Sequence, residues 1–170
     1  MNILGLEGGN MKNKIFVFMA CFMMIVSIGF ARVGVSLDTF YTLPGVSLNF
    51  SNYEINNAYS NYFSVGVGFP YGKVEMGQLW KMGGSPFRVG LVEGAESSFI
   101  IQGYYFGPAL QYDISNNVTF RVYGGAMYAN SPFGDAIGTA IINGITGGTE
   151  NFNSGYQWIG MGGVSLTGYF

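Results

Sequence analysis

The side chains that most often carry chemistry are scarce in this sequence. It contains no histidine, and its one cysteine, Cys21, lies within an apolar run near the amino terminus. Catalysis through a histidine base, a disulfide framework and a thiolate metal site are therefore not expected. Asp135 and Glu150 lie in a glycine-rich segment and could form a carboxylate pair, but no nucleophile accompanies them. We interpret them as solvated loop acids and predict a protein that is not an enzyme and has no cofactor or metal site.

Most other charged residues alternate with apolar ones at a period of two. Arg121, for example, lies between Phe120 and Val122. This period is typical of a β-strand with one apolar face. Charges of both signs that share the opposite face could pair with each other if that face lines a common interior. The residues expected to form this lumen charge cluster are Asp38, Lys73, Glu75, Lys81, Arg88, Asp113 and Arg121.

Eight segments with this alternation are separated by clusters of Gly, Pro, Asn and Ser, which indicate turns. A turn is predicted at residues 43–45, although a kink within one long strand is an alternative there. The longest irregular segment covers residues 131–154. The predicted fold is all-β, an up-and-down antiparallel barrel of eight strands over residues 32–170, preceded by a signal-peptide helix. The predicted strands are residues 32–41, 45–52, 60–69, 72–82, 86–94, 98–114, 118–129 and 156–170.

The amino-terminal region is typical of a secretory signal peptide. Two lysines close to Met11 precede an apolar run over residues 15–28, and a small-x-small site ends at Ala31. We expect residues 1–31 to be this signal, with Met11 as an alternative start. The run is shorter than the roughly 20 residues of a transmembrane helix, which disfavours an uncleaved anchor. A lipoprotein signal at Cys21 is a further alternative that the preceding residues fit poorly.

The direction of the apolar face separates two kinds of barrel. A soluble barrel would turn it inward and expose mostly Gly, Ser, Tyr and Asn, yet charged residues make up only 9% of this chain, against about 25% in soluble domains. A transmembrane barrel turns it toward lipid and keeps charges inside. We predict the transmembrane arrangement, in which Glu93 is an exception that has to reach the lipid headgroups. The predicted membrane-interface aromatics are Trp80, Tyr112, Tyr128, Tyr156 and Trp158.

Residues 155–170 form a long uncharged segment with alternating apolar residues that ends on Phe170. This segment resembles the last strand of bacterial outer-membrane β-barrels, and residues 32–170 as a whole are similar in pattern to the small eight-stranded members. The resemblance implies export to the outer membrane, contact with its lipid, and recognition of the last strand by the barrel-assembly machinery. The implied assembly signal is Leu166, Tyr169 and Phe170, although Gly168 stands where the family has an aromatic.

The expected function is a structural or surface-interaction role in the outer membrane. The segment at residues 131–154 is a candidate site for an extracellular partner. One alternative is a narrow porin-like channel, because many inward positions, such as Gly77 and Gly163, are glycine. A second alternative is a soluble periplasmic ligand-binding barrel. Enzymes among similar barrels rely on histidine, which this chain lacks, and no basic patch suggests nucleic acid.

Overall fold

The computed structural model describes residues 32–40, 43–69, 71–98, 101–130, 139–140, 143–144 and 155–170. The predicted signal peptide, the alternative start at Met11 and nearly all of residues 131–154 lie outside this part of the chain. Within it, eight strands follow one another in sequence order. They are β1 (Arg32–Phe40), β2 (Leu43–Ser51), β3 (Tyr59–Gly68), β4 (Tyr71–Lys81), β5 (Phe87–Ser98), β6 (Gln102–Asp113), β7 (Val118–Asn130) and β8 (Gln157–Tyr169).

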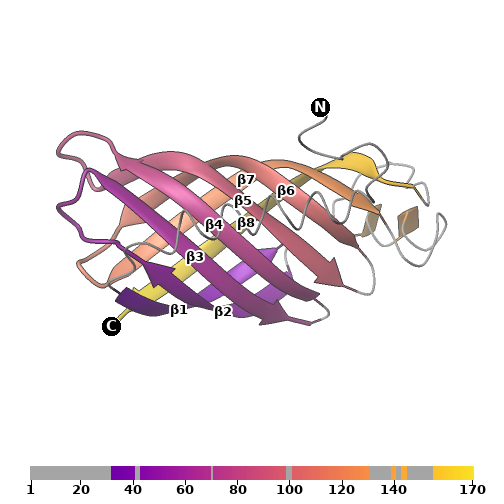
Figure 1. Ribbon diagram of the computed structural model, residues 1–170, viewed down its shortest axis with the longest axis horizontal. Helices are drawn as coiled ribbons and strands as arrows, with labels where there is room; N and C mark the ends of the chain where they lie inside the picture. Colours follow the sequence, from indigo (N-terminus) through magenta and orange to yellow (C-terminus); the bar gives the residue numbers. More distant parts are fainter. Residues whose placement is uncertain are drawn as a thin grey trace, which may run out of the picture.

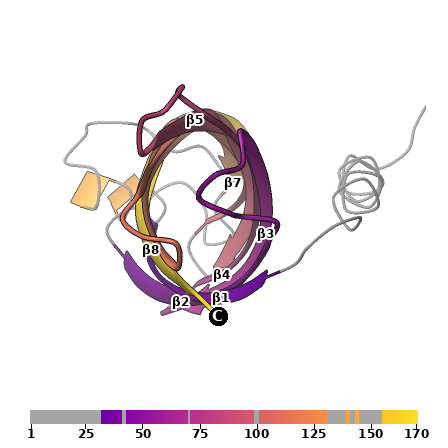
Figure 2. The same ribbon diagram turned by 90° about the vertical axis from the view of Figure 1, so that its left-hand side faces the viewer.

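The strands form a closed antiparallel barrel in which each pairs with its sequence neighbours (Figures 1 and 2). Closure comes from β1 and β8, which pair from Gly34 opposite Tyr169 to Phe40 opposite Gly163. The predicted up-and-down barrel of eight strands is therefore confirmed. Closure leaves no sheet edge along these paired segments, so their backbone amides and carbonyls find partners within the wall.

Three boundaries differ from the prediction by more than one residue, namely the start of β2, the end of β5 and the start of β6, which is at Gln102 instead of residue 98. Residues 43–45, predicted to be a turn, are the start of β2, where Pro44 pairs with Thr39 of β1. A proline is tolerated there because β3 does not reach far enough to require its missing N–H. The alternative of a single kinked strand is also wrong, since β1 and β2 are separate. Strand β5 continues to Ser98, beyond the predicted end at residue 94, because β4 and β6 both extend alongside it.

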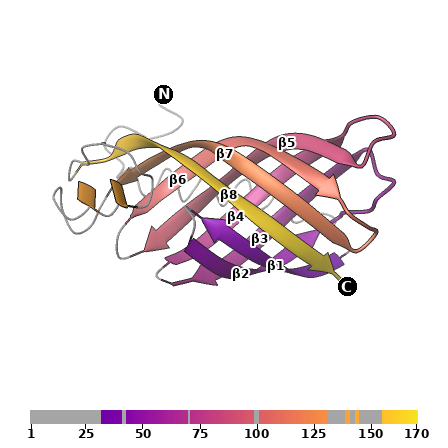
Figure 3. The same ribbon diagram turned by 180° about the vertical axis from the view of Figure 1, so that it is seen from behind.

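The connections are distributed unequally between the two ends of the barrel. We call the end where β1 begins the Arg32 end, and the end where β8 begins the Gln157 end (Figure 3). Residues 52–58, 82–86 and 114–117 join strands at the Arg32 end, and the connection at residues 52–58 is the longest of these three. At the Gln157 end, β2 begins three residues after β1 ends, β4 begins three residues after β3 ends, and β6 begins four residues after β5 ends.

The alternation predicted from the sequence separates the two faces of the wall. Outward side chains such as Leu37, at 63% exposure, and Val67, at 69%, contrast with Glu75 at 1% and Arg88 at 0%. Because paired residues on neighbouring strands point the same way, each strand keeps its apolar face in line with the next. Among the described residues, no helix has the length and hydropathy needed to cross a bilayer.

Candidate functional site

Glu75 of β4 is the centre of a buried polar network inside the barrel. The hydroxyl of Tyr62 donates to its Oε1 at 2.9 Å, and the hydroxyl of Tyr105 donates to its Oε2 at 2.8 Å. Nη1 of Arg121 lies 3.3 Å from Oε1, and Nζ of Lys73 lies 3.5 Å from Oε2. The hydrogen-bond and ion-pair partners of this one carboxylate thus come from four strands, and all five residues are buried.

The two cations of this network have further partners. Lys73 pairs with Asp38 at 3.1 Å, and Asp38 also accepts a hydrogen bond from Ser47. Arg121 donates from Nε to Gln111 at 3.3 Å, and its guanidinium carbon lies 3.5 Å from the centre of the Tyr62 ring. The ring face gives Arg121 a cation–π contact, while its Nη2 makes no hydrogen bond to a described residue. Two carboxylates and two cations balance one another, so the network is electrically neutral.

A second ion pair joins Arg88 and Asp113 nearer the Arg32 end, with Nε of Arg88 2.8 Å from Oδ2 of Asp113. Gln111 connects the two groups, because its amide also donates to Asp113 at 2.9 Å. Of the seven residues predicted for the lumen charge cluster, the structure therefore brings six into linked contacts in the interior. Lys81 is the exception, since it is only half-buried and donates to the carbonyl of Ile55 at 2.5 Å.

Residues 52–58, which we call the cap loop, fold over the Arg32 end of the barrel. Arg88 holds this loop by donating to the carbonyls of Asn57 and Glu54, each at 2.8 Å. Tyr53 is buried against the ring of Tyr169 at 5.2 Å, and its hydroxyl donates to the carbonyl of Ser115 at 3.0 Å. The unusual length of this connection thus has a structural consequence, because it covers the interior instead of only reversing the chain.

Tyrosine rings occupy the space beside the inward glycines. A Cβ atom added at Gly94 would lie 2.5 Å from the Tyr105 ring, one at Gly163 would lie 2.6 Å from the Tyr123 hydroxyl, and one at Gly34 would lie 2.8 Å from the Tyr169 ring. These distances are too short for a real side chain, so glycine is required where a tyrosine ring lies against the inner face of the wall. The glycines therefore accommodate rings and do not by themselves create an open bore.

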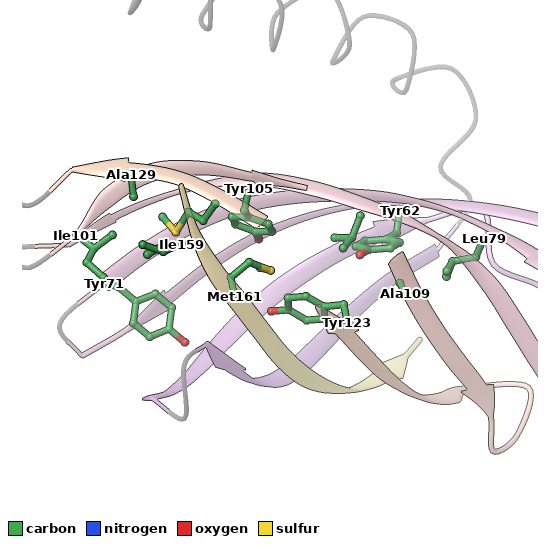
Figure 4. Close-up of a cluster of buried hydrophobic side chains, with 12 residues drawn as sticks. Tyr62, Tyr71, Leu79, Ile101, Tyr105, Ala109, Tyr123, Ala129, Ile159 and Met161 are labelled. Carbon is green, nitrogen blue, oxygen red and sulfur yellow. The ribbon is translucent and has the colours of Figure 1, made fainter. Parts of the chain in front are cut away.

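The interior toward the Gln157 end is mostly apolar, although Glu96 of β5 is also buried there. Ile101, Met127 and Ala129 lie here with Ile159 and Met161 of β8, and all are at most 7% exposed. Figure 4 shows Ile101, Ala129 and Ile159 close together, with Tyr105 and Tyr62 further along the barrel. The described interior thus changes from mostly apolar at this end to charged in its middle and at the Arg32 end.

The predicted interface aromatics form two groups on the outer face. At the Arg32 end, Trp80 packs on Tyr59 at 5.7 Å and Tyr112 packs on Phe87 at 5.0 Å. At the Gln157 end, Tyr128 contacts both Tyr156 and Trp158 at 5.1 Å. Rings on neighbouring strands therefore gather near each end of the barrel.

The three residues of the predicted assembly signal lie on different sides of the wall. Leu166 points outward, Tyr169 is buried against the cap loop, and Phe170 is 80% exposed. The backbone N–H of Phe170 donates to the carbonyl of Val33 at 2.9 Å. This bond continues the pairing of β8 with β1 past the last strand residue.

Sequence reasoning missed one acidic residue of the wall and misplaced another. Glu96 was left between strands, but it lies on the inward face of β5 opposite Lys73, is 6% exposed, and its Oε2 has no hydrogen-bond partner among the described residues. The even-numbered positions of β5 that include Arg88 would have identified it. Glu93 was expected to reach headgroups from a strand end. It instead lies within β5 and accepts a hydrogen bond from Tyr104 of the neighbouring strand.

Tyr53 makes the cap loop sensitive to alkaline pH. Its burial, together with the negative charge of Asp113, raises the pKa of the Tyr53 phenol to about 12 from an ordinary 10, against the opposing effect of Arg88. A folded-state pKa above the unfolded value stabilises the fold below pH 10, and this contribution is lost between pH 10 and pH 12. We expect the unfolding free energy of the wild type to fall between pH 9 and pH 11 by about 1 kcal/mol more than that of Tyr53→Phe. Urea titrations of both proteins at the two pH values measure this difference, and equal falls would contradict the assignment.

The arrangement supports ion pairing and packing more directly than catalysis. The described residues contain no group of three or more His, Cys, Asp or Glu side chains placed to bind a metal ion. The carboxylates with several polar contacts, Asp38, Glu75 and Asp113, are all engaged by cations. Asp135 and Glu150 lie outside the described residues. Comparisons of this chain with protein-family models, curated proteins and solved structures find no match.

Proposed function

We propose that this protein is a bacterial outer-membrane β-barrel with a structural or surface-interaction role and no catalytic activity. The observation that carries the proposal is the opposite chemistry of the two faces of the wall. Seven charged side chains of the described strands are buried inside, whereas the outward positions of the eight strands are mostly aliphatic, aromatic or glycine. In water this exterior would be a continuous apolar surface far larger than the few hundred Å² that soluble monomers tolerate.

The outer face fits a bilayer in two further respects. Aromatic residues gather near both barrel ends, which is where transmembrane barrels place the rings that contact the lipid interface. The strands have 9 to 13 residues, and about 9–11 tilted residues cross the hydrocarbon core. No lysine or arginine lies on the outward face of the described strands. This agrees with the cost of about 2–4 kcal/mol for placing either residue in lipid at the middle of the bilayer.

The filled interior favours a barrel that does not conduct. Tyr62, Tyr105 and Tyr123 cross the interior, Glu75 and Arg121 pair among them, and the cap loop covers one end. We therefore expect no discrete conductance steps from the full chain in planar bilayers. Regular steps that change when Arg121 is neutralised would instead favour the narrow channel.

Outer-membrane lipid is the principal partner in this proposal. Strand β8, with Leu166 on its outer face, is the segment that the barrel-assembly machinery would recognise, and residues 131–154 would meet an extracellular partner. Fractionation of cells that express the full chain tests the compartment. Recovery with outer-membrane vesicles, and gel migration that changes on heating, support the proposal. Release into the periplasmic fraction by osmotic shock would refute it and favour the soluble barrel.

A charge placed on the outer face separates lipid from water as its surroundings. Leu48 points outward in the middle of β2 and is 51% exposed, whereas Val33 points outward next to the Arg32 end. In a bilayer, Leu48→Arg should lower the unfolding free energy by about 2–4 kcal/mol, and Val33→Arg by about 0–1 kcal/mol. Urea titration of the variants in vesicles measures both. Tolerance of Leu48→Arg to within 0.5 kcal/mol, as at an ordinary surface site, would show that this face meets water.

A further inference from the structure

A groove is present in the outer face of the wall where β4, β5 and β6 meet. Its volume is about 420 Å³. Met76 forms its floor, because this side chain has the outward parity of β4 but is only 3% exposed, whereas Leu91 beside the groove is 61% exposed. The outward side chains that line the groove are Met76, Gln78, Leu91, Glu93, Tyr104 and Phe106.

Two polar side chains in this groove have unused hydrogen-bonding capacity. Oε2 of Glu93 accepts a hydrogen bond from the Tyr104 hydroxyl, but no described group donates to its Oε1. The amide of Gln78 also has no hydrogen-bond partner among the described residues. On a face surrounded by hydrocarbon such groups are costly unless a partner satisfies them. An occupant of the groove therefore has to be mostly apolar and to carry a hydrogen-bond donor.

The polar residues of the groove lie on a line that runs along the barrel. Glu93 of β5 pairs with Met76, which lies two residues from Gln78 on β4. Glu93 also pairs with Phe106, which lies two residues from Tyr104 on β6. Each step from Gln78 to Glu93 to Tyr104 therefore moves to the next strand and advances two residues along the barrel. Such a step covers about 7 Å along the strand and about 5 Å across it, which inclines the line by about 35° to the strands. Strands of transmembrane barrels tilt by about 35–45° from the barrel axis, and Figure 1 shows β4 and β5 running obliquely to that axis. The line of polar residues is inclined to the strands by a similar angle in the opposite direction, so it runs nearly parallel to the barrel axis.

We propose that the groove holds one acyl chain of a membrane lipid and that this chain carries a hydroxyl group, which donates a hydrogen bond to the free oxygen of Glu93. Acyl chains lie along the bilayer normal, which is the direction of the groove if the barrel spans the membrane. This inference rests on the proposed function, since it requires the outer face to lie in lipid. A second copy of the chain fits less well, because the outward face of the described strands has no cation to offer Glu93.

Displacement of a quencher from Trp80 tests the proposal. Trp80 lies two residues from Gln78 on the same outward face of β4, and Trp158→Phe would leave it as the single tryptophan. The full chain with this substitution is inserted into phosphatidylcholine vesicles, and its fluorescence is quenched with 9,10-dibromostearic acid. We expect 10-hydroxystearic acid to restore the fluorescence at about a fivefold lower concentration than stearic acid, which is the effect of one additional hydrogen bond.

Variants of the groove separate the hydrogen bond from the apolar fit. Glu93→Leu removes the acceptor and should make the two fatty acids equally potent, whereas Glu93→Gln retains a carbonyl acceptor and should keep part of the preference. Tyr104→Phe leaves both oxygens of Glu93 free and should keep the preference in full. Val35→Ala, on the outward face of β1, is the matched control and should change neither fatty acid.

Four outcomes overturn the inference, and the last of them also overturns the proposed function. Equal potency of the two fatty acids on the parent chain contradicts the hydroxyl contact, and quenching that no competitor reverses contradicts a defined groove. Efficient disulfide cross-linking of Leu91→Cys between copies, with no effect of either fatty acid, would assign the groove to a second copy. If brominated phospholipid fails to quench Trp80 at all, the chain has not inserted, and the proposed function fails together with this inference.

Discussion

Replacing Glu75 with leucine should lower the unfolding free energy by about 3–5 kcal/mol, which is the usual cost of removing one partner from a buried ion pair. The substitution leaves Arg121 and Lys73 with only Asp38 to balance them, so the interior acquires one uncompensated positive charge. It also removes the acceptor of two buried hydroxyls, those of Tyr62 and Tyr105. Urea titration in vesicles, followed by tryptophan fluorescence, measures the loss.

A double variant separates the charge from the packing. Glu75→Leu combined with Arg121→Leu leaves Lys73 and Asp38 as a neutral pair. The unfolding free energy lost by the double variant should therefore be about 1–3 kcal/mol smaller than the sum of the losses of the two single variants. Glu54→Gln removes an exposed carboxylate and serves as the control, with an expected change within 0.5 kcal/mol. A loss below 1 kcal/mol for Glu75→Leu would show that this carboxylate does not organise the interior.

Arg88→Met should have an effect of similar size, about 3–5 kcal/mol, because it leaves Asp113 buried without its cation. It also removes the hydrogen bonds to the carbonyls of Glu54 and Asn57 that hold the cap loop. Tyr53 should then become accessible, so chymotrypsin should cleave the variant in this loop under conditions where the wild type stays intact. Lysine at position 88 should not restore protection, since its ammonium lacks the planar fork that reaches several acceptors.

Two further variants separate the roles of Arg88. Arg88→Met combined with Asp113→Leu removes both charges and should recover stability, yet the cap loop should remain open to chymotrypsin. Lys81→Met removes one hydrogen bond to Ile55 from a half-buried side chain and should cost only about 1–2 kcal/mol. Full resistance of Arg88→Met to chymotrypsin would contradict the role given to this arginine in holding the cap loop.

The sequence by itself determined the faces of the wall. Alternation is a local property, so Phe120, Arg121 and Val122 could be assigned to opposite faces without knowledge of the neighbouring strands. Turn residues and strand lengths then led to eight strands and a closed barrel. The errors were at boundaries, such as residues 43–45 and the end of β5, where pairing with adjacent strands overrode the local turn signals.

Only the tertiary structure decided which inward side chains meet. Glu75 of β4 contacts Arg121 of β7 because closure and strand tilt bring these positions to the same depth, and no local pattern encodes that depth. The same holds for the cap loop, because the predicted strand bounds left a gap there but did not show its attachment to Arg88. It also holds for Glu93, which accepts a hydrogen bond from Tyr104 on the neighbouring strand. The physical reason is that the two-residue period specifies the side of the wall, whereas partners across the interior depend on the register of all eight strands together.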